Sequence, residues 1–309
     1  MILTICPNPS IDCTIELDSL NVGKLNRVDN KVETYSGKAL NVSVGIARLG
    51  GQCFATGFMF DAHARLFEQV LDRVNVKHDF VYNHGCARTN YKIIDKRAML
   101  TEINDRGEAV SKDKQAELIE KVKLLAPNHE IAVMSGSLPK GVEPAFYGEV
   151  LSVIPKKVKV IIDAEKANTL SALGSRDIFM VKPNLRELEE FTNANIHTLQ
   201  DMVKASRRYF DKGVKFVLIS LGSEGAVLTD GTDSYFCKSA SVAVNSTVGA
   251  GDSMVAAICV GLQKGVPMPE LLRMATAAGT AAVTTSGTNL FYKDKYDEIY
   301  SKIYSEKIY

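Results

Sequence analysis

The sequence predicts an α/β fold with a mostly parallel central sheet, in a single domain over residues 1–309. Short runs rich in β-branched residues alternate with amphipathic stretches along most of the chain, which is typical of repeated βαβ units. No repeat period, low-complexity tract or Pro/Gly-rich linker interrupts this alternation. The two observations together favour one domain in which helices cover a parallel sheet.

The elements of this sheet follow one another along the chain and are identified by their hydrophobic periodicity. The clearest strands are Ile2–Cys6, Phe54–Met59, Ile131–Ser135, Val158–Asp163, Phe179–Lys182 and Phe216–Ser220. The predicted helices are Leu40–Leu49, Arg65–Val74, Asp113–Leu125, Thr198–Phe210 and Pro269–Thr284, with a further helix over the apolar run Met254–Leu262.

Two segments, about 11–35 and 78–106, alternate like strands with no helix between their strands. Such strands do not easily join a parallel sheet in sequence order, so we expect a small, separate antiparallel sheet. A sheet of this kind could close over a phosphoryl-transfer site as a lid and exclude competing water. Its exposed edges favour pairing with a second copy, so a homodimer through the lid is expected.

Composition excludes several classes of protein. Lys plus Arg total 37 against 36 Asp plus Glu, a net charge of +1 that favours neither nucleic acid nor an anionic membrane. No segment approaches the roughly 20 apolar residues of a membrane span. Met1–Cys6 lacks a basic flank, which indicates a strand rather than a signal peptide, and a cytoplasmic protein. The six cysteines lack metal-type spacing and are interpreted as buried free thiols.

The segment Thr247-Val248-Gly249-Ala250-Gly251-Asp252, just before an apolar helix, is the most informative motif. Glycines there leave backbone N–H groups free at the positive end of a helix dipole, a site suited to phosphate. A carboxylate beside a phosphate site can accept the proton of an attacking hydroxyl. The alternative is an ordinary turn with an Asp N-cap. No Walker-type Gly-x-x-x-x-Gly-Lys-Ser/Thr motif occurs.

Cations and amides mark two further candidates. Lys38 and Asn41, after Gly37, share a helical face and suit a sugar hydroxyl or phosphate, unless they are simply solvated. The predicted lid strand places Arg88, Asn90 and Lys92 on one face, which could clamp a phosphate or be the wet side of a sheet.

Three loops follow predicted strands, where open α/β sheets collect ligands. Ser135 begins one of them, in the run Ser135–Gly141. Lys182-Pro183-Asn184 with Glu187 supplies an amide and a carboxylate that could hold Mg²⁺ through water, or is an acidic helix start. The loop Ser220–Gly225 has two glycines suited to backbone approach to nucleotide phosphates.

In this order the motifs resemble the PfkB (ribokinase-like) carbohydrate kinase family from Met1 to about Gly287. The resemblance rests on Asn8-Pro9-Ser10-Ile11-Asp12, Gly37-Lys38 with Asn41, Ser135–Pro139, Lys182-Pro183-Asn184 with Glu187, Ser220-Leu221-Gly222 and Thr247–Ser253. It implies a three-layer α/β/α fold with a mostly parallel sheet and a small β-sheet lid.

The resemblance also implies a role for each candidate. Asp252 would be the base, with Gly249, Ala250 and Gly251 as the anion hole. The implied sugar and sugar-phosphate ligands are Asp12, Arg27, Gly37, Lys38, Asn41, Arg88, Asn90 and Ser135. The implied ATP ligands are Lys182, Asn184, Ser220, Gly222, Gly225, Val248 and Gly279, with Mg²⁺ at Glu187 and Asn184 through water.

Within the family, Arg27, Arg88 and Thr101–Asn104 are similar to the 1-phosphofructokinase pattern. The implied reaction is ATP-dependent phosphorylation of a ketohexose phosphate, most simply fructose 1-phosphate to the 1,6-bisphosphate, with tagatose 6-phosphate as the alternative substrate. A non-catalytic sugar-phosphate sensor on the same fold is a further alternative. A Rossmann dehydrogenase is disfavoured because no Gly-x-Gly-x-x-Gly follows the first strand.

Three segments depart from the family pattern. Ser36–Ala39 replaces Gly-Gly-Lys-Gly, Asp163–Lys166 lacks the expected small residues, and Phe60–His63 replaces a Gly-rich turn. These departures concern substrate choice more than phosphoryl transfer.

Overall fold

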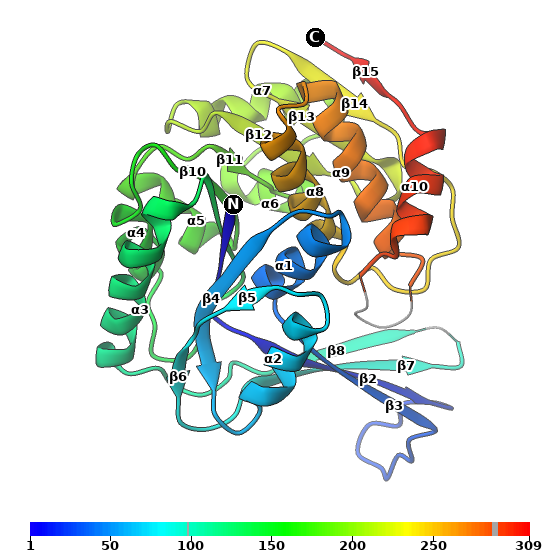
Figure 1. The fold of residues 1–309 in the computed structure, drawn as a ribbon. Helices are drawn as coiled ribbons and strands as arrows, with labels where there is room; N and C mark the ends of the chain where they lie inside the picture. The colour runs from blue at the N-terminus through cyan, green and yellow to red at the C-terminus, as the bar shows by residue number, and fades with distance from the viewer. Residues whose placement is uncertain (98, 286–289) are drawn as a thin grey trace.

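A computed structural model describes residues 1–97, 99–285 and 290–309. It confirms an α/β fold around a large, mostly parallel sheet (Figure 1). In order across this sheet the strands are β15 (Ser305–Lys307), β14 (Ser234–Cys237), β13 (Ala226–Thr229), β12 (Phe216–Ser220), β11 (Met180–Val181), β10 (Lys159–Asp163), β9 (Ile131–Ser135), β1 (Ile2–Cys6), β4 (Cys53–Phe60) and β5 (Lys77–His78), with β6 (Val81–Asn83) beside β4. The neighbouring strands β12, β11, β10, β9, β1, β4 and β5 run parallel to one another. At the other end of the sheet, β13, β14 and β15 each pair antiparallel with their neighbours.

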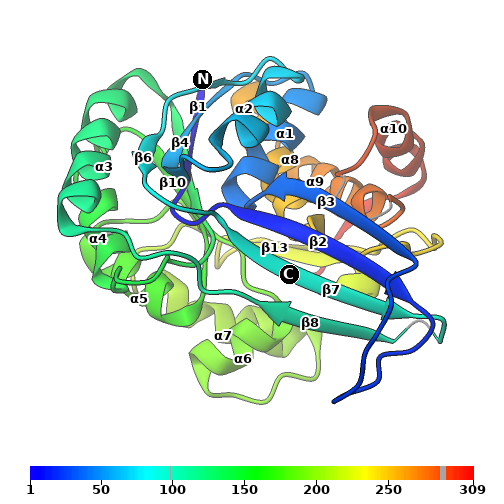
Figure 2. The same ribbon diagram turned by 90° about the horizontal axis from the view of Figure 1, so that it is seen from below.

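Helices cover both faces of the sheet and make the three layers. One group comprises α1 (Lys38–Arg48), α2 (Ala64–Asp72), α8 (Ala250–Lys264), α9 (Met268–Ala282) and α10 (Lys293–Lys302). The other comprises α3 (Lys112–Leu125), α4 (Ala145–Ser152), α5 (Lys166–Ser175), α6 (Leu185–Thr192) and α7 (Leu199–Phe210), with short 3₁₀ turns η1 (Ala126–Asn128) and η2 (Gly222–Glu224). Figure 2 shows the two groups on opposite sides of the sheet.

The core lies where the central strands meet the most apolar helices. Every residue of β1 and β9 is buried, as expected for strands covered on both faces. Helices α8 and α9 are rich in alanine and pack closely on each other, and a Cβ at Gly45 of α1 would lie 2.7 Å from the Ala256 Cβ. Small residues therefore set the close spacing of the helices that carry the site.

The small sheet consists of β2 (Ser10–Leu17), β3 (Asn30–Ser36), β7 (Arg88–Asp95) and β8 (Leu100–Asn104), in the order β3-β2-β7-β8. It is separate from the large sheet, as predicted, but it is not wholly antiparallel because β2 and β7 run parallel. Both strands leave the same edge of the large sheet, after β1 and β6, so they point the same way. The predicted second lid segment, about 78–106, begins too early, because β5 and β6 pair with β4 of the large sheet.

The other predicted strands and helices agree with the structure within a few residues, although the strand predicted at Phe179–Lys182 is reduced to β11. The sequence pattern did not predict helix α10 or strands β13, β14 and β15. It also did not predict helices α4 and α5, each of which is short and contains a glycine that weakens the helical signal. Gly148 of α4 serves close packing, because a Cβ there would lie 2.9 Å from the Ser171 carbonyl oxygen in α5.

No helix in the described ranges is long and apolar enough to cross a bilayer.

Candidate active site

A cleft of about 370 Å³ lies at the carboxyl edge of the large sheet, where the small sheet faces α1 and α8. It is the place where open α/β sheets bind ligands. Many residues predicted from the sequence line it together: Asp12, Gly37, Lys38, Asn41, Arg88, Asn90, Lys182, Val248, Gly249, Gly251 and Asp252. Residues as far apart in the sequence as Asp12 and Asp252 are thus brought into one cavity.

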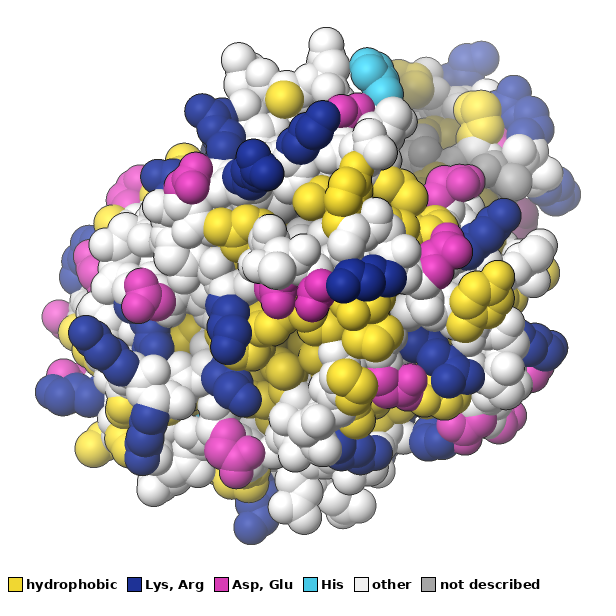
Figure 3. Space-filling view, turned by 90° about the horizontal axis from the view of Figure 1, so that it is seen from above, with side chains coloured by type: hydrophobic (Ala, Val, Ile, Leu, Met, Phe, Trp, Pro, Cys, Tyr) yellow, Lys and Arg dark blue, Asp and Glu magenta, His cyan; other side chains and the backbone are white. Residues whose placement is uncertain are grey.

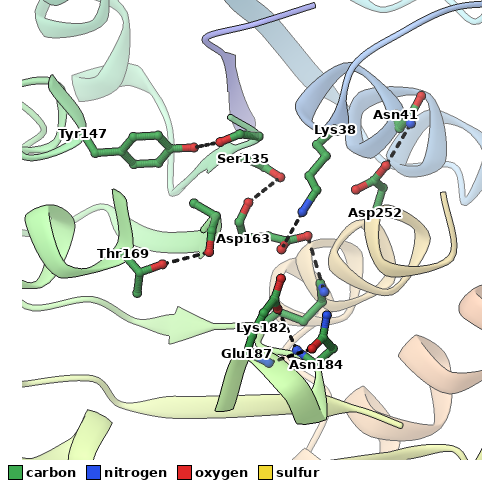
Figure 4. Close-up of polar contacts among 12 residues, drawn as sticks. Lys38, Asn41, Ser135, Tyr147, Asp163, Thr169, Lys182, Asn184, Glu187 and Asp252 are labelled. Atoms are coloured by element: carbon green, nitrogen blue, oxygen red, sulfur yellow. Dashed lines mark hydrogen bonds and ion pairs between the residues drawn. The ribbon is translucent and has the colours of Figure 1, made fainter. Parts of the chain in front are cut away.

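Asp252 lies buried in the first turn of α8. The Asn41 side-chain amide donates a 2.8 Å hydrogen bond to Oδ2 of Asp252 (Figure 4). Burial raises the pKa of Asp252 to about 6, against the opposing effect of the nearby Lys38 ammonium. A carboxyl with this pKa is ionised at neutral pH yet basic enough to accept a proton.

The glycine at the start of α8 is required by the local geometry. Gly249 caps α8 at φ 77°, in the left-handed region, and a Cβ there would lie 2.6 Å from Leu290 Cδ2. A Cβ at Gly251 would lie 3.0 Å from the Lys182 Nζ. The N-terminus of α8 therefore brings its free N–H groups and the Lys182 ammonium to the same place, which suits an anion.

Asp163, at the end of β10, links the two cleft lysines. Its Oδ1 lies 3.2 Å from the Lys38 Nζ and its Oδ2 lies 3.4 Å from the Lys182 Nζ (Figure 4). Burial opposes ionisation of Asp163, but the two lysines together hold its pKa below the ordinary value. The same contact with Asp163 raises the pKa of Lys38, so this lysine stays charged.

The small sheet closes the other side of the cleft. Asp12 accepts hydrogen bonds from the Ser36 hydroxyl at 2.7 Å and the Asn90 amide at 3.0 Å, and it lies 3.6 Å from the Lys92 Nζ. Across the described ranges, Arg88 Nε is among the few buried side-chain polar atoms without a hydrogen-bond partner, as is Asn90 Oδ1. Burial lowers the Arg88 pKa. Unpartnered polar atoms lining a cleft indicate groups kept for a ligand.

Residues 8–295 match the model of the pfkB family of carbohydrate kinases. The chain belongs to this family. It is 29% identical to a 1-phosphofructokinase of Vibrio cholerae, covering 100% of this chain and 97% of the relative. It is 30% identical to a tagatose-6-phosphate kinase of Staphylococcus epidermidis, covering 98% of both chains.

Solved structures show the same fold. Phosphofructokinase-2 from Escherichia coli, in complex with substrates and products, superposes with a TM-score of 0.90 at 29% identity, over 97% of this chain and 98% of that one. The α/β/α fold with its small sheet is therefore shared with a pfkB-type kinase, as expected from the motifs.

Some predicted residues of this pfkB-family chain lie outside the cleft. Ser135 is buried, and its hydroxyl donates to the Asp163 carbonyl at 3.1 Å, so it supports Asp163 rather than facing a ligand. Arg27 is exposed in the loop between β2 and β3 and does not line the cavity. Gly279 lies in α9, where a Cβ would lie 2.8 Å from Met254 Cγ, so it serves helix packing.

The remaining candidates are not among the residues that line the cleft. Ala250 is the first residue of α8, and Ser220 pairs with Asn184 through an isolated β-bridge. Gly222 and Gly225, both at positive φ, shape the turn after β12. Their role toward ATP stays a prediction.

Asn184 and Glu187 form a capping box at the start of α6. The Asn184 N–H donates to Glu187 Oε2 and the Glu187 N–H donates to Asn184 Oδ1, both at 2.8 Å. Within the described residues no group of three or more His, Cys, Asp or Glu side chains could hold a metal directly. Glu187 is thus a helix-capping carboxylate, and Mg²⁺ held there through water stays a prediction.

The sequence interpretation missed Asp163 as a site residue, although it is central to the cleft charges. The available signal was a carboxylate directly after the buried apolar run Val160–Ile162. Lys92, predicted with Arg88 as part of a phosphate clamp, also lines the cleft. The other lining residues not predicted as ligands are Ser10, Ser36, Glu102, Asn104, Gly136, Ser137 and Glu165.

Proposed function

We propose that the protein is an ATP-dependent ketohexose phosphate kinase whose substrate is fructose 1-phosphate and whose product is fructose 1,6-bisphosphate. The observation that carries this proposal is the pairing of two features across one cleft. Asp252 and the N-terminus of α8 lie on one side, and Arg88, whose buried Nε has no hydrogen-bond partner, lies on the other. A substrate with a hydroxyl at one end and a phosphate at the other matches this arrangement.

In the proposed reaction Asp252 removes the proton from the acceptor hydroxyl as that oxygen attacks the γ-phosphorus of ATP. Asn41 orients the carboxylate through its hydrogen bond. The transition state spreads negative charge over the transferred group and needs alignment and positive charge more than covalent chemistry. The N–H groups at the start of α8, with Lys182 and Lys38, provide that charge.

Mg²⁺ bound with the nucleotide would neutralise further phosphate charge, and Glu187 is the carboxylate placed to hold its water shell. The loop from Ser220 to Gly225 and Val248 supports the proposal as the place for the nucleotide, next to Asn184.

The sugar would be held from the small sheet. Asp12, already fixed by Ser36 and Asn90, offers acceptor oxygens for hydroxyl groups. Arg88 and Lys92 lie on the same strand face and would bind the phosphate of the substrate. The Ser36 departure from the family pattern thus has a use, because its hydroxyl positions Asp12.

MgATP turnover measured by ADP release with fructose 1-phosphate, tagatose 6-phosphate, fructose 6-phosphate and ribose tests the proposal. Fructose 1-phosphate should give the highest kcat/KM. A higher value for tagatose 6-phosphate would select the alternative substrate. Fastest turnover on ribose would reject the phosphate clamp at Arg88, and binding of the sugar phosphates without ADP release would indicate a sensor.

We also propose that the enzyme works in the cytoplasm as a homodimer through the small sheet. The face of this sheet away from Asp12 and Asn90 carries Tyr91 and Ile103, paired side by side and 40% and 56% exposed. A second copy would cover these side chains. Light scattering should give twice the chain mass, and Ile103→Asp should give the monomer; a monomeric wild type at micromolar concentration would reject the dimer.

A further inference from the structure

A second concave site lies at the opposite edge of the large sheet, where β10, β11 and β12 begin. This cavity, of about 340 Å³, is lined by Lys156, Lys159, Arg176, Asp177, Phe179 and Lys215, which we call the basic pocket. Strand β10 runs from Lys159 in the pocket to Asp163 in the cleft. At roughly 3.3 Å per residue, the two sites are more than about 10 Å apart.

The basic pocket carries an excess of positive charge. In the part of the chain that the structure describes, its four cationic side chains face the single carboxylate of Asp177. Ion pairs are numerous elsewhere on the surface, yet none in the described ranges includes Lys156, Lys159 or Lys215. Unpaired cations around a concavity raise the local concentration of anions.

Two of these lysines are held together by an aromatic ring. The Lys159 and Lys215 Nζ atoms lie 5.3 and 5.6 Å from the centre of the Phe179 ring. Cation–π attraction therefore keeps two ammonium groups at the same wall of the pocket. Figure 3 looks onto this end of the molecule and shows Lys and Arg side chains around exposed hydrophobic side chains.

Arg176 gives the pocket a rigid charged wall. Its Nη1 donates to the Ile154 carbonyl at 2.7 Å and its Nη2 donates to the Val158 carbonyl at 3.0 Å. The guanidinium is thus fixed by backbone groups and contributes charge, while the lysines remain able to donate hydrogen bonds.

We propose that the basic pocket binds a small molecule carrying two or more phosphate groups. Clustered lysines suit several phosphate oxygens, and a cavity of this size accommodates a small ligand better than a nucleic acid, which needs an extended basic surface. The ligand could be a nucleotide or a phosphate compound without a base, because both share the recognised chemistry. This site is remote from the catalytic cleft and does not depend on the proposed kinase reaction.

The test titrates ATP and pyrophosphate separately into the full-length protein by calorimetry. The test variant is Lys159→Gln/Lys215→Gln, and the matched control is Lys157→Gln/Lys212→Gln, which neutralises two exposed lysines outside the pocket. Wild type should bind ATP at two sites, of which the cleft is one. The test variant should weaken one site for both ligands at least tenfold, while the control stays within twofold.

Phe179→Leu separates the two sources of ligand, because losing the ring that holds Lys159 and Lys215 should weaken both probes, whereas losing a contact with a nucleobase should weaken ATP alone. A larger loss of affinity for ATP than for pyrophosphate identifies a nucleotide, and equal losses identify a ligand without a nucleobase. A single ATP site unchanged in the test variant overturns the proposal, as does equal weakening in the control. Tighter binding to poly(U) RNA or to phosphatidylserine vesicles than to both probes also overturns it. Thermal unfolding checks folding, and Lys215→Gln alone is used if the pair does not fold.

Discussion

Asp252 combines burial, a raised pKa and a place at the start of α8, and these properties give a direct test at the scale of one residue. Asp252→Asn keeps the size of the side chain but removes the proton acceptor. We expect kcat to fall on the order of 10² to 10⁴-fold, with ATP affinity within a few-fold. Steady-state kinetics and nucleotide titration measure both. Asp211→Asn, at an exposed carboxylate ending α7, is the control; residual activity within about tenfold of wild type would contradict the role.

The same carboxyl predicts how activity depends on pH. Asp252 acts as a base only when ionised, and burial raises its pKa from 3.8 to about 6. We therefore expect kcat/KM to fall below about pH 6, whereas an ordinary aspartate would stay ionised to about pH 4. A pH–rate profile with saturating MgATP shows the midpoint. A flat profile down to pH 4.5 would be inconsistent with this base.

Arg88 tests recognition of the substrate phosphate. Its Nε is buried and has no hydrogen-bond partner among the residues that the structure describes, so Arg88→Gln removes a charge that is available to a ligand. We expect kcat/KM for the sugar phosphate to fall on the order of 10- to 100-fold, mainly through KM. Arg106→Gln, at an exposed site outside the cleft, should change neither constant. Equal effects of the two variants would mean that Arg88 acts through long-range electrostatic attraction and makes no direct contact with the substrate phosphate.

Among the elements, the turn between β12 and β13 offers a matched pair of glycines. A Cβ at Gly225 (φ 118°) would lie 2.0 Å from the Cys237 carbonyl oxygen, whereas a Cβ at Gly222 (φ 59°) has nothing within 4 Å. Gly222→Ala should cost only the left-handed strain of about 1 to 2 kcal/mol. Gly225→Ala should cost more than about 3 kcal/mol, because the turn must move away from β14. Denaturant unfolding compares them, and similar losses would show that the close approach is not rigid.

Hydrophobic periodicity predicted the central strands β1, β4 and β9 to β12 of the large sheet and several of the helices beside it, because the burial pattern of a strand or helix is visible in its own sequence. Periodicity did not reveal the direction of β7 beside β2, since strand direction depends on where each chain segment leaves the large sheet. It also missed α4, whose glycine serves contact with α5 rather than helix stability.

The residues of the candidate site also fall into those predicted from a local motif and those that only the fold brings together. Residues within one motif, such as Gly249 to Asp252, could be predicted because their spacing alone implies their geometry. Asp163 could not, because its lysine partners come from α1 and from the end of β11 and only the fold brings them together. Arg27 shows the converse: the resemblance assigned it to the substrate, and the structure places it on the exposed β2–β3 loop.

On the scale of the whole molecule, the two sheets meet at Cys6, the last residue of β1. A Cβ at Gly57 would lie 1.9 Å from the Cys6 carbonyl oxygen, and one at Gly37 would lie 3.0 Å from its Sγ, so two glycines enclose this residue. Cys6 is almost wholly buried, and burial raises its pKa to about 11. The thiol at this junction is therefore inert while the sheets keep their present arrangement.

Because Gly37 directly follows β3, a movement of the small sheet away from β1 should expose the Cys6 thiol, so the reactivity of Cys6 tests for that movement. A thiol-reactive dye at neutral pH should modify the exposed Cys86 within minutes and Cys6 far more slowly. Adding fructose 1-phosphate with a non-hydrolysable ATP analogue should slow Cys6 further and leave Cys86 unchanged, as read by mass spectrometry of the labelled peptides. Equal rates of Cys6 labelling with and without these ligands would mean that the small sheet does not move when substrates bind and that the cleft is always open to solvent.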